Sequence, residues 1–358
     1  MGGQDEEILQ FQANLRRINE GYVMFILCTV GVMGNILAFL TFSSKLVRNT
    51  TTSLYLRALA IADIIVLTTA VFRYKTYKLF LDESHELDTV FHFDAYSEVY
   101  IEPLHWIALG SSSFITIALS FERYLAVRFP LIIKRKCTTC TVMLCIFLVV
   151  GISVVISIPN YFSYKLVHFN FFGEEIAVAT LTDMGKSSLY PCIYHNYLIP
   201  VLWYIIPAAL LSVINILLIF LVQKSSRIRV GVPNTLNSNR KLTVMIIFIL
   251  LVYIICNLPK CIFMFYKIVN QMTNKNECTD ITNKIDAPQT KAYLIIEVIT
   301  ELLNVLNSCL NFCVYCLVGT RFRTELVRIL LCRWMTRQDL VLINGSYQTS
   351  SIRRGATS

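Results

Sequence analysis

Seven long apolar runs set the strongest limit on how this chain of 358 residues can fold. A helix needs about 20 mostly apolar residues to cross the hydrocarbon core of a bilayer, and each run is long enough to do so. Lipid cannot satisfy free backbone N–H and C=O groups, and the runs lack the alternation of barrel strands, so helices are predicted. The runs cover residues 22–42, 54–72, 101–127, 141–162, 197–222, 242–266 and 292–318.

Composition agrees with a membrane protein. Hydrophobic residues make up 55% of the chain and charged residues 15%, with a mean hydropathy of +0.59. A soluble domain carries about 25% charged residues. The net charge of +9 arises from basic loops on one side of the runs, so no nucleic-acid partner is expected. We predict an all-α fold, a seven-transmembrane helix bundle, without enzyme activity.

Basic and acidic residues lie in opposite sets of loops. Arg128, Arg135 and Arg227 belong to the basic set, and Asp88 and Glu174 to the acidic set. Cytoplasmic loops carry the excess of Lys and Arg, so the N-terminus is expected outside the plasma membrane and the C-terminus inside. The expected parts are an extracellular N-terminus (1–21), the bundle (22–319), an amphipathic membrane-surface helix (320–333) and a disordered cytoplasmic tail (334–358).

Polar residues inside the runs are candidate functional residues, because an ionisable group in a membrane span is costly. Asp63 lies within the second run, and polar side chains occur at similar depth in the first, third and seventh runs. Two interpretations stay open: a hydrogen-bond network alone, or a network that also holds Na⁺ as an allosteric ion. No other metal or cofactor is expected. The network consists of Asn35, Asp63, Ser112, Asn307, Ser308 and Asn311.

Carboxylates gather near the outer ends of the third and seventh runs. Glu98 and Glu102 lie one helical turn apart, and so do Glu297 and Glu301. Together with the acidic outer loops they predict a negatively charged vestibule that attracts a cationic ligand. The alternative is internal ion pairing, in the candidate pairs Glu301–Lys260 and Glu102–Arg73.

Short motifs occur in six of the runs, and together they resemble the signatures of rhodopsin-like (class A) G-protein-coupled receptors. The resemblance covers all seven runs, residues 22–332. The motifs are Gly34-Asn35, Leu59 to Asp63, Glu122-Arg123-Tyr124, Pro207, Cys256-Asn257-Leu258-Pro259 and Asn311-Phe312-Cys313-Val314-Tyr315.

Finer details resemble invertebrate FMRFamide-type neuropeptide receptors. The segment from Arg123 to Val127 is followed by Pro130-Leu131, the sixth run has a Cys-Asn-x-Pro motif, and the seventh has Asn-Phe-x-x-Tyr. The resemblance implies a receptor for an extracellular neuropeptide, a short cationic amidated peptide, that activates a heterotrimeric G protein. Arrestin and a receptor kinase are further expected partners. The alternatives are a chemosensory receptor for a small molecule and a seven-helix transporter or channel.

The resemblance also implies roles for individual residues. Arg123, held by Glu122 at rest, is expected to meet the G protein once freed, and Tyr315 to stabilise the open form. Proline removes a backbone hydrogen bond, so bends are expected at two positions. The expected activation residues are Glu122, Arg123, Tyr124, Pro207, Asn257, Pro259 and Tyr315. The expected ligand-binding residues are Tyr74, Tyr77, Glu102, His105, Trp106, Lys260, Phe263, Glu297 and Glu301.

The cysteines depart from the family's usual pattern. The outer end of the third run reads Ser97 to Tyr100, without the cysteine that the family usually has there. Cys192 and Cys278 lie in predicted outer loops, where disulfides can form, and they either pair or stay free thiols. On the inner side, Cys332 is a candidate palmitoylation site.

Overall fold

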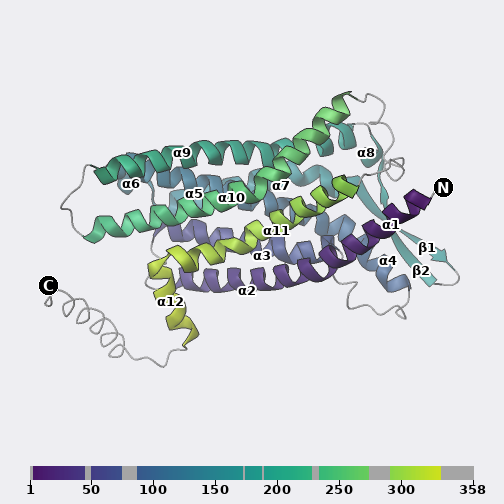
Figure 1. Ribbon diagram of the computed structural model, residues 1–358, viewed down its shortest axis with the longest axis horizontal. Helices are drawn as coiled ribbons and strands as arrows, with labels where there is room; N and C mark the ends of the chain where they lie inside the picture. Colours follow the sequence, from purple (N-terminus) through teal and green to yellow (C-terminus); the bar gives the residue numbers. More distant parts are fainter. Residues whose placement is uncertain are drawn as a thin grey trace.

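The computed structural model describes residues 3–44, 50–74, 87–171, 174–187, 189–227, 234–273 and 291–331. Within these ranges, seven helices are long and apolar enough to cross a membrane, and they lie side by side in an elongated bundle (Figure 1). The predicted seven-helix bundle is therefore confirmed. Its helices are α2 (Met24–Ser43), α3 (Thr51–Arg73), α5 (Glu102–Arg128), α7 (Thr139–Ser163), α9 (Ile206–Arg227), α10 (Asn234–Thr273) and α11 (Lys291–Val318).

Several membrane helices extend beyond the apolar runs that predict them. The first is preceded by α1 (Gly3–Arg16) and a π-helical segment η1 (Arg17–Val23), where the sequence predicted only an extracellular terminus. An apolar run marks the part of a helix that lipid covers, whereas the backbone can continue as a helix beyond it. Further segments precede the third and fifth membrane helices: α4 (Leu87–Tyr96), η3 (Ser97–Ile101), η4 (Leu189–Leu198) and η5 (Val201–Ile205).

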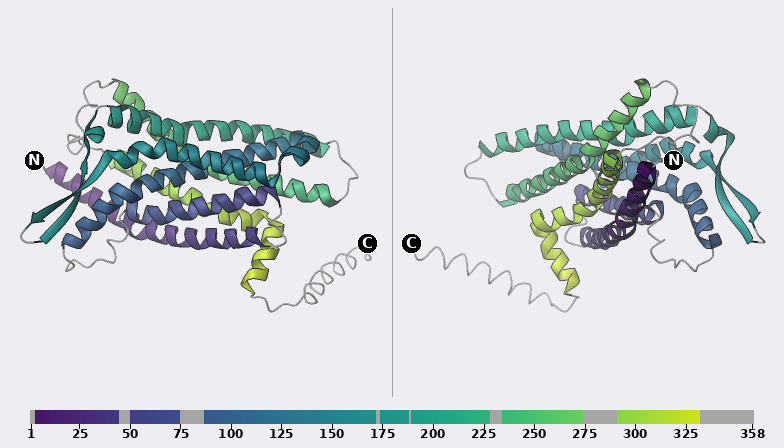
Figure 2. Two further views of the ribbon diagram at one scale, coloured as in Figure 1. Left: turned by 180° about the vertical axis from the view of Figure 1, so that it is seen from behind. Right: turned by 45° about the vertical axis from the view of Figure 1, so that its right-hand side comes forward.

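A two-stranded antiparallel sheet follows α7 and adds to the expected all-α fold. Strand β1 (Tyr164–Phe171) pairs with β2 (Glu174–Leu181), with Tyr164 opposite Leu181 and Phe171 opposite Glu174. Both strands are rich in β-branched and aromatic residues, which fit a pleated surface. The hairpin projects at the end of the bundle where α1 and α4 also lie (Figure 2).

Three short helices complete the described chain: α6 (Pro130–Lys136), α8 (Asp183–Lys186) and α12 (Thr320–Leu330). The last of these turns away from the bundle at the end opposite to α1 (Figures 1 and 2). Phe322 and Leu326 are its buried apolar residues, while Arg321 and Arg323 are exposed.

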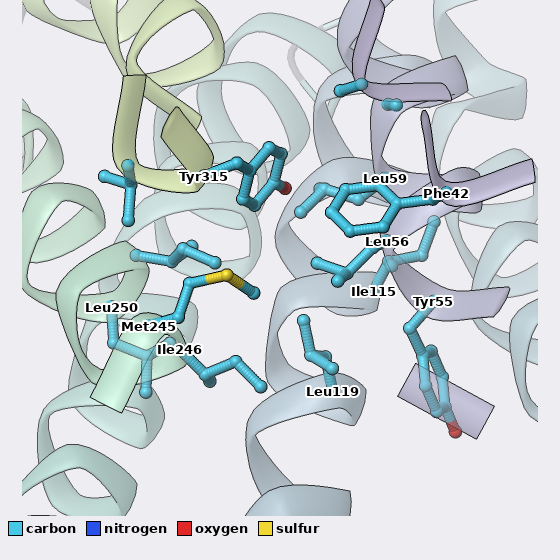
Figure 3. Packing of buried hydrophobic residues seen from close by; sticks show 14 of the residues in the cluster. Phe42, Tyr55, Leu56, Leu59, Ile115, Leu119, Met245, Ile246, Leu250 and Tyr315 are labelled. Atoms are coloured by element: carbon cyan, nitrogen blue, oxygen red, sulfur yellow. The ribbon is translucent and has the colours of Figure 1, made fainter. Parts of the chain in front are cut away.

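The largest buried cluster lies in the half of the bundle next to α12. Phe42, Leu59, Leu119, Ile246 and Tyr315 belong to it and are each at most 3% exposed (Figure 3). Glycine allows the helices to approach closely in another part of the bundle, where a Cβ atom on Gly110 in α5 would lie 2.8 Å from the Trp203 ring. The packed helices hold the polar residues described below in fixed positions.

Candidate functional site

A cavity of about 490 Å³ opens at the end of the bundle that carries α1 and the hairpin. Pockets for small ligands and peptide side chains have volumes in this range. Side chains from α1, α3, η3, α5, α7, β1, η4 and α11 line it, so distant parts of the sequence meet there. All four predicted vestibule carboxylates, Glu98, Glu102, Glu297 and Glu301, are among the lining residues.

Internal ion pairs hold Glu102, Glu297 and Glu301 in the described part of the structure. Glu102 pairs with Arg73 and also accepts a hydrogen bond of 2.9 Å from Trp106 Nε1. The Arg73 guanidinium lies 5.0 Å from the centre of the Trp106 ring, which adds a cation–π contact. The two carboxylates of α11 are paired as well: Lys267 Nζ lies 3.1 Å from Glu297 Oε1, and Lys260 Nζ lies 4.0 Å from Glu301 Oε1. The structure therefore contains the internal ion pairs that the sequence analysis gave as the alternative.

The predicted aromatic and basic residues occupy different positions around the cavity. Tyr74 and Trp106 line it, whereas His105 is buried against Thr69, with Nδ1 2.9 Å from Oγ1. Phe263 packs on Tyr293, with ring centres 5.2 Å apart, and is not among the lining residues. Lys260 and Lys267 are not lining residues, but they pair with the lining carboxylates Glu301 and Glu297. Tyr77 lies outside the described residues.

Several lining residues were not predicted. Gln12 and Leu15 of α1, Asn160 of α7, and Tyr190 and His195 of η4 all line the cavity. The aromatic residues at 190, 194 and 195 are the one feature of the sequence that could have indicated the η4 part of the cavity lining. The described rings stack, with Tyr190 5.4 Å from Tyr194 and 6.4 Å from His195 between ring centres.

The polar residues in the middle of the bundle surround Asp63, as the sequence predicts. Asp63 is fully buried, and its Oδ1 accepts hydrogen bonds from Ser112 Oγ at 2.7 Å and Ser308 Oγ at 3.0 Å. Its Oδ2 accepts from Asn311 Nδ2 at 2.7 Å. Asn35 Nδ2 donates to the Ser308 carbonyl at 3.0 Å, which ties α2 to α11. Asn307 is buried on the same helix as Ser308.

At the opposite end of the bundle, Glu122 collects hydrogen-bond donors from three elements. Arg123 Nη2 lies 2.6 Å from Oε1 and Arg123 Nε 2.7 Å from Oε2. Thr51 Oγ1 at the start of α3 donates to Oε1 at 2.9 Å, and the Cys137 thiol after α6 lies 3.9 Å from the same oxygen. Burial and the Glu122 charge raise the pKa of Cys137, so the thiol stays protonated and can donate. Tyr124 is partly buried and packs against the largest buried cluster.

The remaining predicted activation residues lie in the core or at helix irregularities. Pro207 is the second residue of α9, directly after η5, and Pro259 lies inside α10. Asn257 is buried and donates to the Tyr253 carbonyl at 2.9 Å. The Tyr315 ring lies 5.0 Å from the Phe42 ring, edge to face (Figure 3). Its hydroxyl has no hydrogen-bond partner among the described residues.

The predicted cysteine chemistry falls outside the described part of the structure. Cys278 and Cys332 are not described, and neither is the side chain of Cys192. Their pairing and modification remain predictions from the sequence.

Comparison with known proteins shows similarity to receptors over most of the chain. The chain is 24% identical to the FMRFamide receptor of Drosophila melanogaster over 343 residues, which cover 94% of this chain and 57% of that receptor. It is 25% identical to galanin receptor 2b of Danio rerio over 325 residues, 90% of this chain and 77% of that protein. Neuromedin-U receptor 2 of Mus musculus is also 25% identical, over 323 residues, 87% of this chain and 75% of that protein.

The family comparison covers most of the bundle. The seven-transmembrane receptor family of the rhodopsin type matches residues 34–315, which include the Asp63 network, the Glu122–Arg123 pair and Tyr315. Such a protein crosses the plasma membrane several times and is a receptor, not an enzyme. The chain belongs to the rhodopsin family of seven-transmembrane receptors.

Proposed function

We propose that this receptor binds a short, cationic, amidated peptide of the Arg-Phe-amide type from outside the cell and activates a heterotrimeric G protein. The observation that carries the proposal is the cavity lined by Glu98, Glu102, Glu297 and Glu301 at one end of a bundle whose other end holds Arg123. The names of the three similar receptors, for FMRFamide, galanin and neuromedin-U, support a peptide ligand.

Recognition of a cationic peptide requires an exchange of ion pairs. Lys267 and Glu297 are 32% and 24% exposed at their side chains, so water reaches the pair and its net free energy is small. A guanidinium can bind a carboxylate through two parallel hydrogen bonds, which an ammonium cannot do. An arginine of the peptide can therefore displace Lys267 from Glu297 at little cost, whereas Lys260 is buried and stays on Glu301.

Activation is a shift between two conformations of the bundle. The conformation described here keeps Arg123 on Glu122, and we assign it to the resting receptor. Peptide binding favours a second conformation in which α10 moves outward at the Arg123 end, and the shift is limited by the difference in affinity between the two states. In this proposal the N-terminus is outside, and arrestin and a receptor kinase act on the C-terminal tail.

The Asp63 network is the proposed site of a sodium ion. Three neutral donors hold a fully buried carboxylate, and none of them carries a compensating positive charge. Burial of an unpaired charge is costly, and a monovalent cation removes much of that cost. The hydroxyl oxygens of Ser112 and Ser308 lie beside the carboxylate and can complete the coordination of Na⁺.

A peptide-library screen that reads calcium and cAMP tests the ligand class. Peptides that end in Arg-Phe-NH₂ are expected to activate cells that express the receptor, and replacement of the arginine by neutral citrulline to lower potency at least tenfold. Glu297→Gln is expected to remove most of this preference, since the neutral amide no longer distinguishes a cation from a neutral isostere. Glu175→Gln, on the exposed hairpin, is the matched control. Activation by small organic molecules alone would instead favour the chemosensory alternative.

A further inference from the structure

Asn160, near the end of α7, is a buried cavity residue with a free amide N–H group. The residue is 5% exposed and lines the cavity. Its Nδ2 atom is buried and has no hydrogen-bond partner in the described part of the chain. A buried donor without an acceptor is unfavourable, and nearly all buried polar groups in proteins have a hydrogen-bond partner. An unpaired one therefore points to an acceptor outside the described residues.

Tyr190 fixes the orientation of this amide. The Tyr190 hydroxyl donates a hydrogen bond of 3.0 Å to Asn160 Oδ1, so Nδ2 is the end of the amide that remains free. Tyr190 is itself 9% exposed and stacks on Tyr194 at 5.4 Å. On the other side, Ser163 Oγ donates to the Asn160 backbone carbonyl at 2.7 Å. The free N–H group therefore belongs to a side chain that the Tyr190 hydroxyl holds in place.

The position of Asn160 distinguishes it from the other buried polar atoms without partners. In the described ranges such atoms also occur in Ser157, Trp203, Asn215 and Asn304, among others, but none of these residues lines the cavity. Among the residues that the structure describes, Asn160 alone combines a lining position with an unpaired buried donor. The missing acceptor is therefore expected to come from a molecule in the cavity.

We propose that Asn160 Nδ2 donates a hydrogen bond to a carbonyl oxygen of the bound peptide, and that Tyr190 positions it. This inference rests on the proposed function, because the ligand is taken to be a peptide. The carboxylates of α11 bind the cationic side chain, while Asn160 on α7 binds a carbonyl in the same cavity. The carbonyl is that of the C-terminal carboxamide or of an internal peptide bond.

The placement of Asn160 can be tested without a ligand. In Asn160→Cys receptors, a membrane-impermeant methanethiosulfonate reagent added outside is expected to label the new thiol above the background of the unsubstituted receptor. Ser157→Cys is the matched control, since Ser157 lies one turn earlier on the same helix, is fully buried and does not line the cavity. Equal labelling of both variants, or of neither, overturns the inference.

The hydrogen bond is tested with the most potent Arg-Phe-NH₂ peptide from the screen. Asn160→Leu, which keeps the side-chain size, is expected to raise the dissociation constant about tenfold, with Ser157→Ala unchanged and both at normal surface expression. Single thioamide substitutions weaken one carbonyl acceptor at a time. One of them is expected to weaken binding to the unsubstituted receptor but not to Asn160→Leu, and its place identifies the terminal or internal carbonyl.

Tyr190→Phe separates positioning from a merely structural role. It is expected to weaken binding in the Asn160 receptor but to have no added effect in Asn160→Leu, because it acts through the amide. Additive losses, or a thioamide effect that persists in Asn160→Leu, overturn the inference. If the Asn160→Cys receptor is labelled but no peptide binds, the proposed peptide ligand is wrong. The hydrogen bond to a peptide is then rejected as well, and only the position of Asn160 in the cavity stands.

Discussion

Arg123 and Glu122 are neighbours in the sequence and form a two-point ion pair, with nitrogen–oxygen distances of 2.6 and 2.7 Å. The Glu122 side chain is only 6% exposed and that of Arg123 only 11%. A buried carboxylate with four donors restrains the guanidinium more strongly than an exposed pair does. This contact holds Arg123 away from the G protein in the proposed resting state.

Glu122→Gln is expected to raise ligand-independent activity severalfold. The neutral amide keeps the size of the side chain but removes the charge that holds the guanidinium, so conformations with Arg123 released become more populated. Nucleotide exchange by the G protein, measured without peptide, is the test. Glu325→Gln is a suitable control, since Glu325 is also buried and contacts Arg328 at 3.5 Å, but in α12. Basal exchange that does not change in Glu122→Gln would contradict the assigned role.

Sodium is expected to lower agonist potency through Asp63. An ion that binds the network as described stabilises the resting conformation, so replacement of Na⁺ by a large organic cation should raise potency. Asp63→Asn should remove this dependence, because the amide carries no charge. The test is to compare agonist dose–response curves in the two salts for the unsubstituted receptor and for Asp63→Asn. A sodium effect that survives in Asp63→Asn at normal expression would place the ion elsewhere.

Gly110→Ala is expected to destabilise the bundle by about 1–3 kcal/mol, as overpacking does in well-packed cores. The added Cβ would lie 2.8 Å from the Trp203 ring, which is itself 1% exposed and cannot move freely. Gly151→Ala is the control, because nothing lies within 4 Å of its added Cβ and alanine favours a helix. Thermal unfolding of the two variants in detergent should show a lower Tm for Gly110→Ala and an equal or higher one for Gly151→Ala. The reverse order would mean that the α5–Trp203 contact is looser than described.

Tyr315→Phe is expected to leave the resting fold intact but to reduce activation by agonist. The hydroxyl has no partner among the described residues, so its removal costs no resting contact, and the ring contact with Phe42 remains. If the hydroxyl makes a contact only in the open form, Tyr315→Phe should lower the maximal rate of agonist-stimulated nucleotide exchange and leave the Tm unchanged. Full activation of Tyr315→Phe would show that the group acts in neither state.

The membrane helices could be predicted because the physical requirement is local. Lipid demands about 20 apolar residues with internal hydrogen bonds, and α3, α7 and α11 begin and end within three residues of the runs that predict them. Helix ends in water have no such requirement, so α1 and α4 were missed. The β1–β2 hairpin did leave a signal, the β-branched and aromatic residues between Tyr164 and Leu181, that an all-α expectation passed over.

The two halves of the candidate site differ in how far the sequence determined them. Asp63 needed partners within the membrane, and the polar spacing on the seventh run supplied Ser308 and Asn311 on one face. At the end of the bundle that carries the cavity, several acidic and basic side chains compete, and only the three-dimensional packing decides that Glu297 pairs with Lys267. Asn160 could not be predicted, because its importance depends on Tyr190, 30 residues away, binding one end of its amide.

The most direct test of the receptor's function is nucleotide exchange by purified G protein with the purified receptor in lipid nanodiscs. A peptide that ends in Arg-Phe-NH₂ should accelerate exchange, its citrulline analogue should do so at least tenfold less potently, and Glu122→Gln should accelerate it without peptide. If Glu122→Gln is active but no peptide in the panel raises exchange in the unsubstituted receptor, the protein couples to G protein and the assignment of a cationic peptide to its cavity is wrong.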